Sequence, residues 1–294
     1  MNPMASRASD GKTGLARRIW EAAGLLWETP AGTVGAGIVT FWVLVAVLAP
    51  LLAPFPPNAT LVPFATPGSP YGGAHFWLGT DHIGRDILSR VIWGSRTVLI
   101  FAPLATLCAY LVGIPLGLLA GYRRGWLDEA LSRFGDLILA FPVLILYILV
   151  IATFGASALN IVLAVTFASA PGIMRIVRGL VLDLRNRDYV AAARMRGEGL
   201  WYILLVEILP NARGPLVVDS CLRLGYVIIT IGVLGFLGLG LPPPDPDWGG
   251  MINETRAMAM AFPHMALFPG IAISSLVLDF NLLADGLREI SLRD

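Results

Sequence analysis

Long uncharged runs alternate with short polar segments along most of the chain. The first run, residues 34–53, contains 20 residues without a charge, which is enough for a helix to cross the roughly 30 Å hydrocarbon core of a bilayer. The runs over residues 97–122 and 224–244 are as long, and residues 257–278 are interrupted only by His264. Residues 137–174 form a 38-residue run that is too long for one span. A turn at residues 155–160 divides it into two expected spans.

This pattern predicts an all-α membrane protein with six transmembrane helices. The expected spans cover residues 34–53, 97–121, 137–154, 159–176, 214–240 and 261–283. A tail over residues 1–33 precedes a transmembrane domain over residues 34–290. The first run is longer than the roughly 7–15 apolar residues of a signal peptide, and no Ala-x-Ala cleavage pattern precedes a mature start. We therefore interpret it as a membrane span.

Composition and charge agree with this interpretation. Apolar residues make up 56% of the chain and charged residues 14%, and the mean hydropathy is +0.73, values typical of membrane proteins. With the N-terminus inside, 16 of the 21 Lys and Arg lie in inner segments, four lie in outer loops and Arg223 lies in a span. Because inner loops of membrane proteins carry an excess of Lys and Arg, we expect both termini in the cytoplasm. The net charge of +1 gives no indication of a nucleic-acid partner.

A polar loop over residues 177–213 separates the fourth and fifth expected spans, and it contains a predicted short helix. Asp188 is a candidate N-cap for this helix. Residues 191–193 are three alanines, which favour helix and leave an outward face almost without side chains. Gly197 is able to adopt the left-handed conformation that closes a helix.

A second helical segment follows the short helix. Apolar residues recur at helical spacing at Leu200, Ile203, Leu204 and Ile208, and we expect Pro210 to end or kink this segment. The spacing alone is equally compatible with a cytoplasmic loop that only covers the ends of its neighbours.

Two patterns inside the expected spans concern packing and charge. Gly113, Gly117 and Gly121 recur every four residues, which predicts a stripe where another helix packs closely. Asp219 and Arg223 are four residues apart, so they face each other on a helix. Such a pair either marks a transport pathway or steadies a helix at the membrane interface.

Motifs for catalysis or metal binding are missing. The sequence Gly11-Lys12-Thr13 is similar to the end of a phosphate-binding loop, but Ser6 replaces the first glycine and no strand precedes it. Cys108 and Cys221 lie in apolar runs, which argues against a disulfide framework or a zinc site. No His-Glu-x-x-His or Gly-x-Ser-x-Gly pattern is present. We expect a non-catalytic chain with no metal site, no cofactor and no ATP site of its own.

The polar loop resembles the signature loop of type I ABC importer permeases. That signature reads Glu-Ala-Ala, three residues, Gly, nine residues, Ile, any residue, Leu-Pro. The positions that match in register are Ala192, Ala193, Gly197, Leu209 and Pro210. Ala191 replaces the leading Glu, and Glu207 stands at the Ile position.

Further stretches are similar to the dipeptide, oligopeptide and nickel permeases, and their order resembles that of the second, C-type permease. They are Leu78-Gly-Thr-Asp81 with Gly84-Arg-Asp86, a Pro-rich turn before Trp248, and Phe280-Asn-Leu-Leu283 before Asp285-Gly-Leu-Arg288. The similarity covers roughly residues 34–290. The outer motif residues that the resemblance singles out are Gly79, Asp81, Gly84, Arg85, Asp86 and Trp248.

The resemblance implies a type I ABC importer permease fold with a cytoplasmic coupling helix between helices four and five. It also implies a bacterial inner-membrane location and four partners, namely a second homologous permease subunit, two cytoplasmic ATPase subunits that bind the ATP, and an extracytoplasmic solute-binding protein. The residues expected in ATPase coupling are Tyr189, Ala191, Ala192, Ala193, Met195, Gly197, Leu200 and Pro210.

The resemblance favours di- or oligopeptides as the solute, with nickel or another small solute as the alternative. A stand-alone secondary transporter predicts an inverted repeat with broken helices at matching positions, which the sequence does not display. An intramembrane enzyme requires a nucleophile or metal constellation, and this too is missing. The sequence therefore predicts half of a peptide-importing pathway that is driven by ATP hydrolysis in other subunits.

Overall fold

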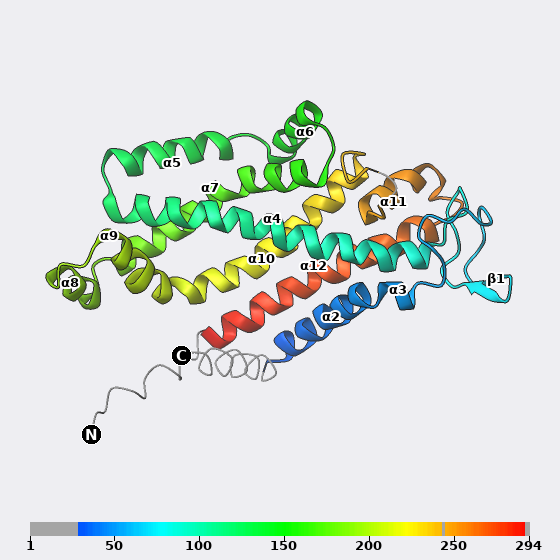
Figure 1. The fold of residues 1–294 in the computed structure, drawn as a ribbon, viewed down its shortest axis with the longest axis horizontal. Helices are drawn as coiled ribbons and strands as arrows, with labels where there is room; N and C mark the ends of the chain where they lie inside the picture. Colours follow the sequence, from blue (N-terminus) through cyan, green and yellow to red (C-terminus); the bar gives the residue numbers. More distant parts are fainter. Residues whose placement is uncertain (1–28, 243–244, 292–294) are drawn as a thin grey trace, which may run out of the picture.

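The computed structural model describes residues 29–242 and 245–291. Most of the expected N-terminal tail, including Gly11-Lys12-Thr13, therefore lies outside the described residues. Five of the described helices are long and apolar enough to cross a membrane, and the number becomes six if a bent pair of helices is taken as one span. Figure 1 shows the long helices running along the longest axis of the molecule. The prediction of a helical membrane protein is confirmed.

The long helices are α2 (Pro30–Val47), α4 (Ile87–Arg123), α7 (Ala158–Leu184), α10 (Leu209–Phe236) and α12 (His264–Ser291). The bent pair consists of α5 (Trp126–Leu139) and α6 (Val143–Phe154). The shorter elements are α3 (Ala49–Leu52), α8 (Asp188–Met195), α9 (Leu200–Tyr202), the π-helix η1 (Ile203–Ile208), α11 (Trp248–Thr255) and the 3₁₀ turn η2 (Arg256–Met258).

The two ends of the molecule carry different elements. Helices α8 and α9 form one end, whereas α3, α11 and the strand β1 (Ser69–Tyr71) lie toward the other (Figure 1). Helix α2 runs toward the β1 end, and α12 packs beside it and runs in the opposite direction. The start of α2 and the end of α12 therefore lie on the same side.

The expected third span is not one helix over residues 137–154. Helix α5 begins at Trp126, and the pair bends by 85° between Leu139 and Val143. Pro142 is the N-cap of α6, and proline disfavours helical geometry in the residue before it. Hydropathy missed α5 because the helix contains charged residues. One of them, Asp128, pairs with Arg178 of α7 at 2.5 Å.

The glycine stripe of α4 packs against α7, as the spacing predicts. A Cβ at Gly113 would lie 2.7 Å from the Cβ of Ile173, and one at Gly121 would lie 2.7 Å from the Cβ of Val181. Both separations are shorter than real Cβ contacts, so these positions bring the two helix backbones together. The stripe is a packing surface, and it fixes α4 and α7 as one unit.

A two-stranded hairpin between α3 and α4 departs from the expected all-helical architecture. Strand β1 pairs antiparallel with β2 (Ala74–Phe76). The connecting Gly72 and Gly73 have φ values of 54° and 83°. Two-residue hairpin turns require positive φ, and glycine provides it without strain. The Gly-Gly pair was the sequence signal for this hairpin.

Candidate functional site

Helix α8 begins and ends with different local geometry. Arg187 occupies its N-cap position without a side-chain capping bond, and Asp188 is the first helical residue rather than the cap. At the other end, Glu198 N–H donates to Ala193 O at 3.2 Å and Gly197 N–H donates to Arg194 O at 3.0 Å. Gly197 has a φ of 79°, which completes a Schellman closure. The predicted role of Gly197 as the helix stop is confirmed.

The three alanines of α8 do not all face outward. Ala193 is fully buried, Ala192 is half-buried and Ala191 is exposed. Successive helical residues are rotated by about 100°, so three neighbours cannot share one face. The expectation of an outward-facing alanine surface is therefore wrong for Ala193. The outward face combines Ala191 with Met195, whose side chain is 84% exposed.

The inward face of α8 closes an apolar cluster at this end of the molecule. Val190 and Ala193 pack there with Ile203, Leu204 and other buried residues of the neighbouring helices. Tyr189 and Leu200, both expected in coupling, are half-buried against the same cluster. These two residues hold α8 in place, and Gly197 and Met195 remain at the surface.

Polar contacts that the sequence reasoning missed also hold α8. Arg196 Nη2 donates to Glu207 Oε1 at 2.9 Å, and Arg194 Nε donates to the Tyr122 hydroxyl at 3.0 Å. The Arg194 guanidinium also lies over the Tyr122 ring, 5.0 Å from its centroid. Glu207, the departure from the signature, was the one sequence sign of such a pair. Helix α8 is thereby tied to the end of α4 and to η1.

Pro210 does not end the helical segment that follows α8. Residues 200–236 form one continuous 37-residue helical stretch. Leu209 N–H donates to Leu204 O, five residues back, at the end of η1. The wider π-helical turn lies where the proline ring crowds the preceding turn and lacks its own N–H. Pro210 is exposed and lies at the start of α10.

The outer motif folds the turn that starts α4. Asp81 Oδ1 accepts hydrogen bonds from Arg85 N–H at 2.9 Å and from Ile83 N–H at 3.0 Å. Its Oδ2 pairs with Arg85 Nε at 2.5 Å. Asp86 is the N-cap of α4 and accepts from Ser89 N–H at 2.8 Å. Burial raises the pKa of Asp86, and the bonds from Ser89 oppose this increase.

Two glycines of the same motif let the preceding segment, which contains Leu61 and Ala65, pack closely against the motif. Gly79 and Gly84 have φ values of 81° and 89°. A Cβ at Gly79 would lie 2.6 Å from Ala65 O, and one at Gly84 would lie 3.1 Å from Leu61 backbone atoms. Leu61 N–H donates to Gly84 O at 2.8 Å. Both positions therefore require glycine for conformation and for space.

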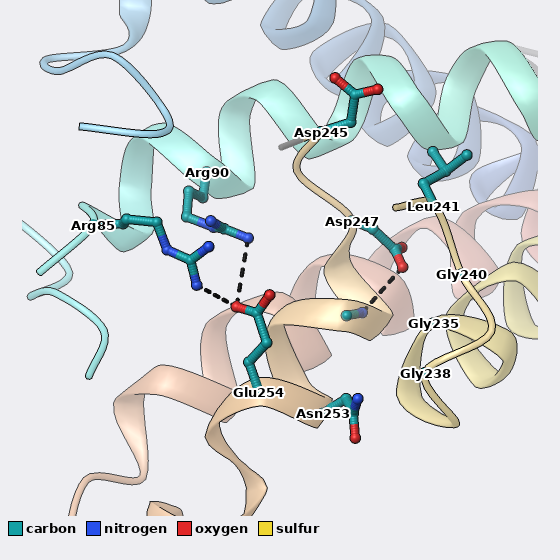
Figure 2. Close-up of a pocket in the computed structure, with 11 residues that line it drawn as sticks. Arg85, Arg90, Gly235, Gly238, Gly240, Leu241, Asp245, Asp247, Asn253 and Glu254 are labelled. Atoms are coloured by element: carbon teal, nitrogen blue, oxygen red, sulfur yellow. Dashed lines mark hydrogen bonds and ion pairs between the residues drawn. The ribbon is translucent and has the colours of Figure 1, made fainter. Parts of the chain in front are cut away.

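Helix α11 completes this outer cluster. Arg85 pairs with Glu254, and Arg90 Nη2 lies 3.8 Å from the same carboxylate. Figure 2 shows both guanidinium groups pointing at Glu254 across a cavity of about 180 Å³. Trp248 is fully buried and donates from Nε1 to Val91 O at 3.0 Å. The structure thus brings the six predicted outer residues together where α4 begins.

Asp247 caps α11 within this cluster. Its carboxylate accepts from Gly249 N–H at 3.3 Å and from Gly250 N–H at 3.1 Å. Burial raises the pKa of Asp247 to about 6, although the two backbone bonds work against this increase. The Asp247 carboxyl lines the same cavity as Arg85, Arg90 and Glu254.

The predicted ion pair inside the fifth helix forms. Arg223 Nε lies 2.7 Å from Asp219 Oδ2, and Asp219 also accepts a hydrogen bond from the Tyr110 hydroxyl of α4. Within residues 29–242 and 245–291, no group of three His, Cys, Asp or Glu side chains is arranged to hold a metal ion.

Comparisons with known proteins agree on one family. The family described as "Binding-protein-dependent transport system inner membrane component" matches residues 113–293. The chain is 45% identical over 213 residues to a glutathione transport system permease protein of Pectobacterium atrosepticum, covering 72% of this chain and 71% of the relative. It is 37% identical over 271 residues to a dipeptide transport system permease protein of Alkalihalophilus pseudofirmus, covering 92% and 88%. A dipeptide transport system permease protein of Haemophilus influenzae is 38% identical over 259 residues, covering 87% and 88%.

Proposed function

Because the chain belongs to the family of inner-membrane components of binding-protein-dependent transport systems, we propose that it forms half of the transmembrane pathway of an ABC importer for small peptides. The relatives named above are permeases for dipeptides and for glutathione, and these solutes share peptide bonds and free carboxylates. This similarity favours peptides over nickel. The other half of the pathway is a second, homologous permease subunit.

In this proposal, two ATPase subunits on the cytoplasmic side bind and hydrolyse the ATP, and a solute-binding protein delivers the peptide at the outer end. Helix α8 lies at the cytoplasmic end, together with the start of α2 and the end of α12. The distribution of Lys and Arg supports this orientation. The cluster of Asp81 and Trp248 then faces outward, where it stabilises the N-terminal end of α4.

The observation that supports coupling through α8 is its exposed face. Met195 projects at the tip of the molecule, and Ala191 beside it adds almost no bulk. A flexible thioether next to a small residue fits a groove on a partner well. The Arg196–Glu207 pair and the buried Val190 join α8 to the long helices. Closure of the ATPases would therefore move α8 and these helices as one body.

The chain offers a matched pair of variants for testing this role. Met195→Glu introduces a charge at the tip of α8, and Met260→Glu makes the same change at the opposite end, where Met260 is 98% exposed. Neither side chain contributes to the core, so both variants are expected to fold. A charge buried in an interface hot spot costs about 2 kcal/mol or more, roughly a 30-fold loss of association.

We expect Met195→Glu to abolish the stimulation of ATP hydrolysis by the loaded binding protein in the reconstituted complex. Met260→Glu should leave the association with the ATPases and their basal ATP hydrolysis unchanged, because Met260 lies at the opposite end. Normal stimulation in the Met195→Glu complex would show that α8 does not carry the coupling contact.

A further inference from the structure

A stripe of polar residues runs along one face of α10 within its apolar sequence. Asp219, Arg223, Tyr226 and Thr230 follow one another at intervals of three or four residues, so they lie on the same side of the helix. Ionisable groups inside a membrane are costly, and they face a protein interior or a water-filled path. The stripe therefore identifies the face of α10 that is turned away from lipid.

This face lines a polar cavity of about 130 Å³ between four helices. Hydroxyl groups and one guanidinium supply its polar atoms, and they come from α4, α6, α7 and α10. The polar lining residues are Thr106, Tyr147, Ser169, Arg223, Tyr226 and Thr230. Tyr226 is 68% exposed, so the cavity lies next to an open surface of this chain. The hydroxyls donate and accept hydrogen bonds, the guanidinium only donates, and none of these groups carries a negative charge at neutral pH.

Contacts on both sides fix the orientation of the Arg223 guanidinium. Its Nε donates to Asp219 at 2.7 Å, and Asp219 is held in turn by the Tyr110 hydroxyl. On the other side, Nη1 and Nη2 each lie 3.4 Å from the position of a Cβ on Gly172. Glycine at this position leaves room for the guanidinium next to α7. The geometry therefore holds the guanidinium by its Nε at Asp219, beside Gly172 of α7, and Arg223 is one of the residues that line the cavity.

A positioned guanidinium with a fork of N–H donors is the side chain best suited to a carboxylate, because two parallel hydrogen bonds form at once. Every free peptide has a C-terminal carboxylate, and its amide groups match the neighbouring hydroxyls. Asp219 balances the charge of Arg223, so the attraction for an anion is moderate. Moderate attraction suits a path, since a transported solute has to leave as well as enter.

Resting on the proposed function, we propose that this cavity is a subsite within the membrane that receives the C-terminal carboxylate of the peptide during its passage. Arg223 binds the carboxylate, Asp219 positions Arg223, and the surrounding hydroxyls bind the backbone amide groups. The Asp219–Arg223 pair is then part of the pathway rather than only a brace within α10.

The test compares dialanine with dialanine amide, which lacks the carboxylate, in proteoliposomes that contain the complete transporter. Both are supplied on saturated binding protein, and initial import rates and ATP hydrolysis are recorded. The main variant is the double replacement Asp219→Asn with Arg223→Gln, which removes both charges and so leaves no unpaired buried ion. Arg223→Lys preserves the positive charge, and Arg256→Gln on the outer surface is the matched control.

A site that hydrogen-bonds a substrate group discriminates strongly against an analogue without it, so the unaltered complex should import dialanine at least about tenfold faster than the amide. The double variant should import both at the slower rate and retain ATP hydrolysis stimulated by the binding protein. Arg223→Lys should keep part of the preference, and Arg256→Gln should keep all of it.

Two results would overturn the proposal of a carboxylate subsite. One is an equal loss for both peptides in the double variant, which would assign the pair to helix stability or to the second permease. The other is an undiminished preference for dialanine in that variant. Failure of the unaltered complex to import either peptide would instead contradict the proposed function itself.

Discussion

A methyl group added at Gly117 tests how closely α4 and α7 are packed. The new Cβ would lie 2.6 Å from Met174 O and 2.6 Å from the Cβ of Val177, whereas ordinary contact begins at 3.4 Å. The helices would have to separate by the difference, about 0.8 Å. Met174 O belongs to the backbone of α7 and cannot rotate away. The strain would therefore be shared with the equally close contacts at Gly113 and Gly121.

The expected change in stability is a balance of two terms. Overpacking a tight interface costs about 1–3 kcal/mol, and alanine in place of glycine in a helix returns about 1 kcal/mol. Gly117→Ala should thus lower the free energy of unfolding by up to about 2 kcal/mol. Gly179 in α7 is the matched control, because a Cβ there meets nothing within 4 Å. Gly179→Ala should show only the gain in helix propensity, and it should raise the free energy of unfolding by up to about 1 kcal/mol.

Thermal denaturation of the purified chain in detergent, followed by size-exclusion chromatography, measures both variants. The midpoint should fall for Gly117→Ala and should rise or stay constant for Gly179→Ala. The opposite signs matter more than the size of either shift, because detergent affects both variants equally. A Gly117→Ala midpoint equal to or above that of Gly179→Ala would mean that the α4–α7 interface tolerates the added methyl group.

Two further predictions concern the ends of the molecule. The pKa of Asp247 is raised from 3.8 to about 6, so the folded state binds a proton more tightly than the unfolded state, and stability should increase as the pH falls from about 7.5 to about 5. Thermal melts across this range should show a smaller increase for Asp247→Asn, and equal slopes would rule out this titration. When the chain is produced without the ATPase subunits, Met195→Cys should react with a membrane-impermeant maleimide in inside-out vesicles and stay unlabelled in intact cells, with Met260→Cys showing the reverse. Labelling of Met195→Cys in intact cells would contradict the proposed orientation.

Local patterns in the sequence were sufficient where the structure depends on local rules. Gly197 closes α8 because the left-handed conformation suits glycine, and the spacing of Gly113, Gly117 and Gly121 places them on one helix face. The uncharged runs identified the apolar helices because hydropathy depends only on the residues of the run itself. The membrane boundaries of the expected spans stay a prediction, because several helices, such as α4, extend well beyond the apolar run.

Non-local contacts explain what the sequence could not reveal. Burial of Ala193 depends on how α8 lies against η1, and nothing within residues 188–197 determines that. Arg85 pairs with Glu254, which is 169 residues away along the chain, so the outer cluster exists only in the folded molecule. Helix α5 was missed because hydropathy counts Asp128 as a charge and cannot detect its pairing with Arg178. In each case a partner far away in the sequence determines whether the residue is buried or paired.

The continuous helix over residues 200–236 connects α8 with the cluster around Asp247 at the other end of the molecule. It spans about 55 Å at 1.5 Å per residue. At its N-terminal end it joins α8 through the Arg196–Glu207 pair, and its middle carries Arg223. At its C-terminal end, Gly235 lies so close to the Asp247 carboxylate that an added Cβ would collide with it. A helix anchored at both ends resists bending except where its hydrogen bonding is irregular, and η1 next to α8 is such a place. Because the Arg196–Glu207 pair fastens α8 to η1 itself, displacement of α8 would tilt α10 as a whole and move Arg223 relative to α7, with any bending confined to the π turn.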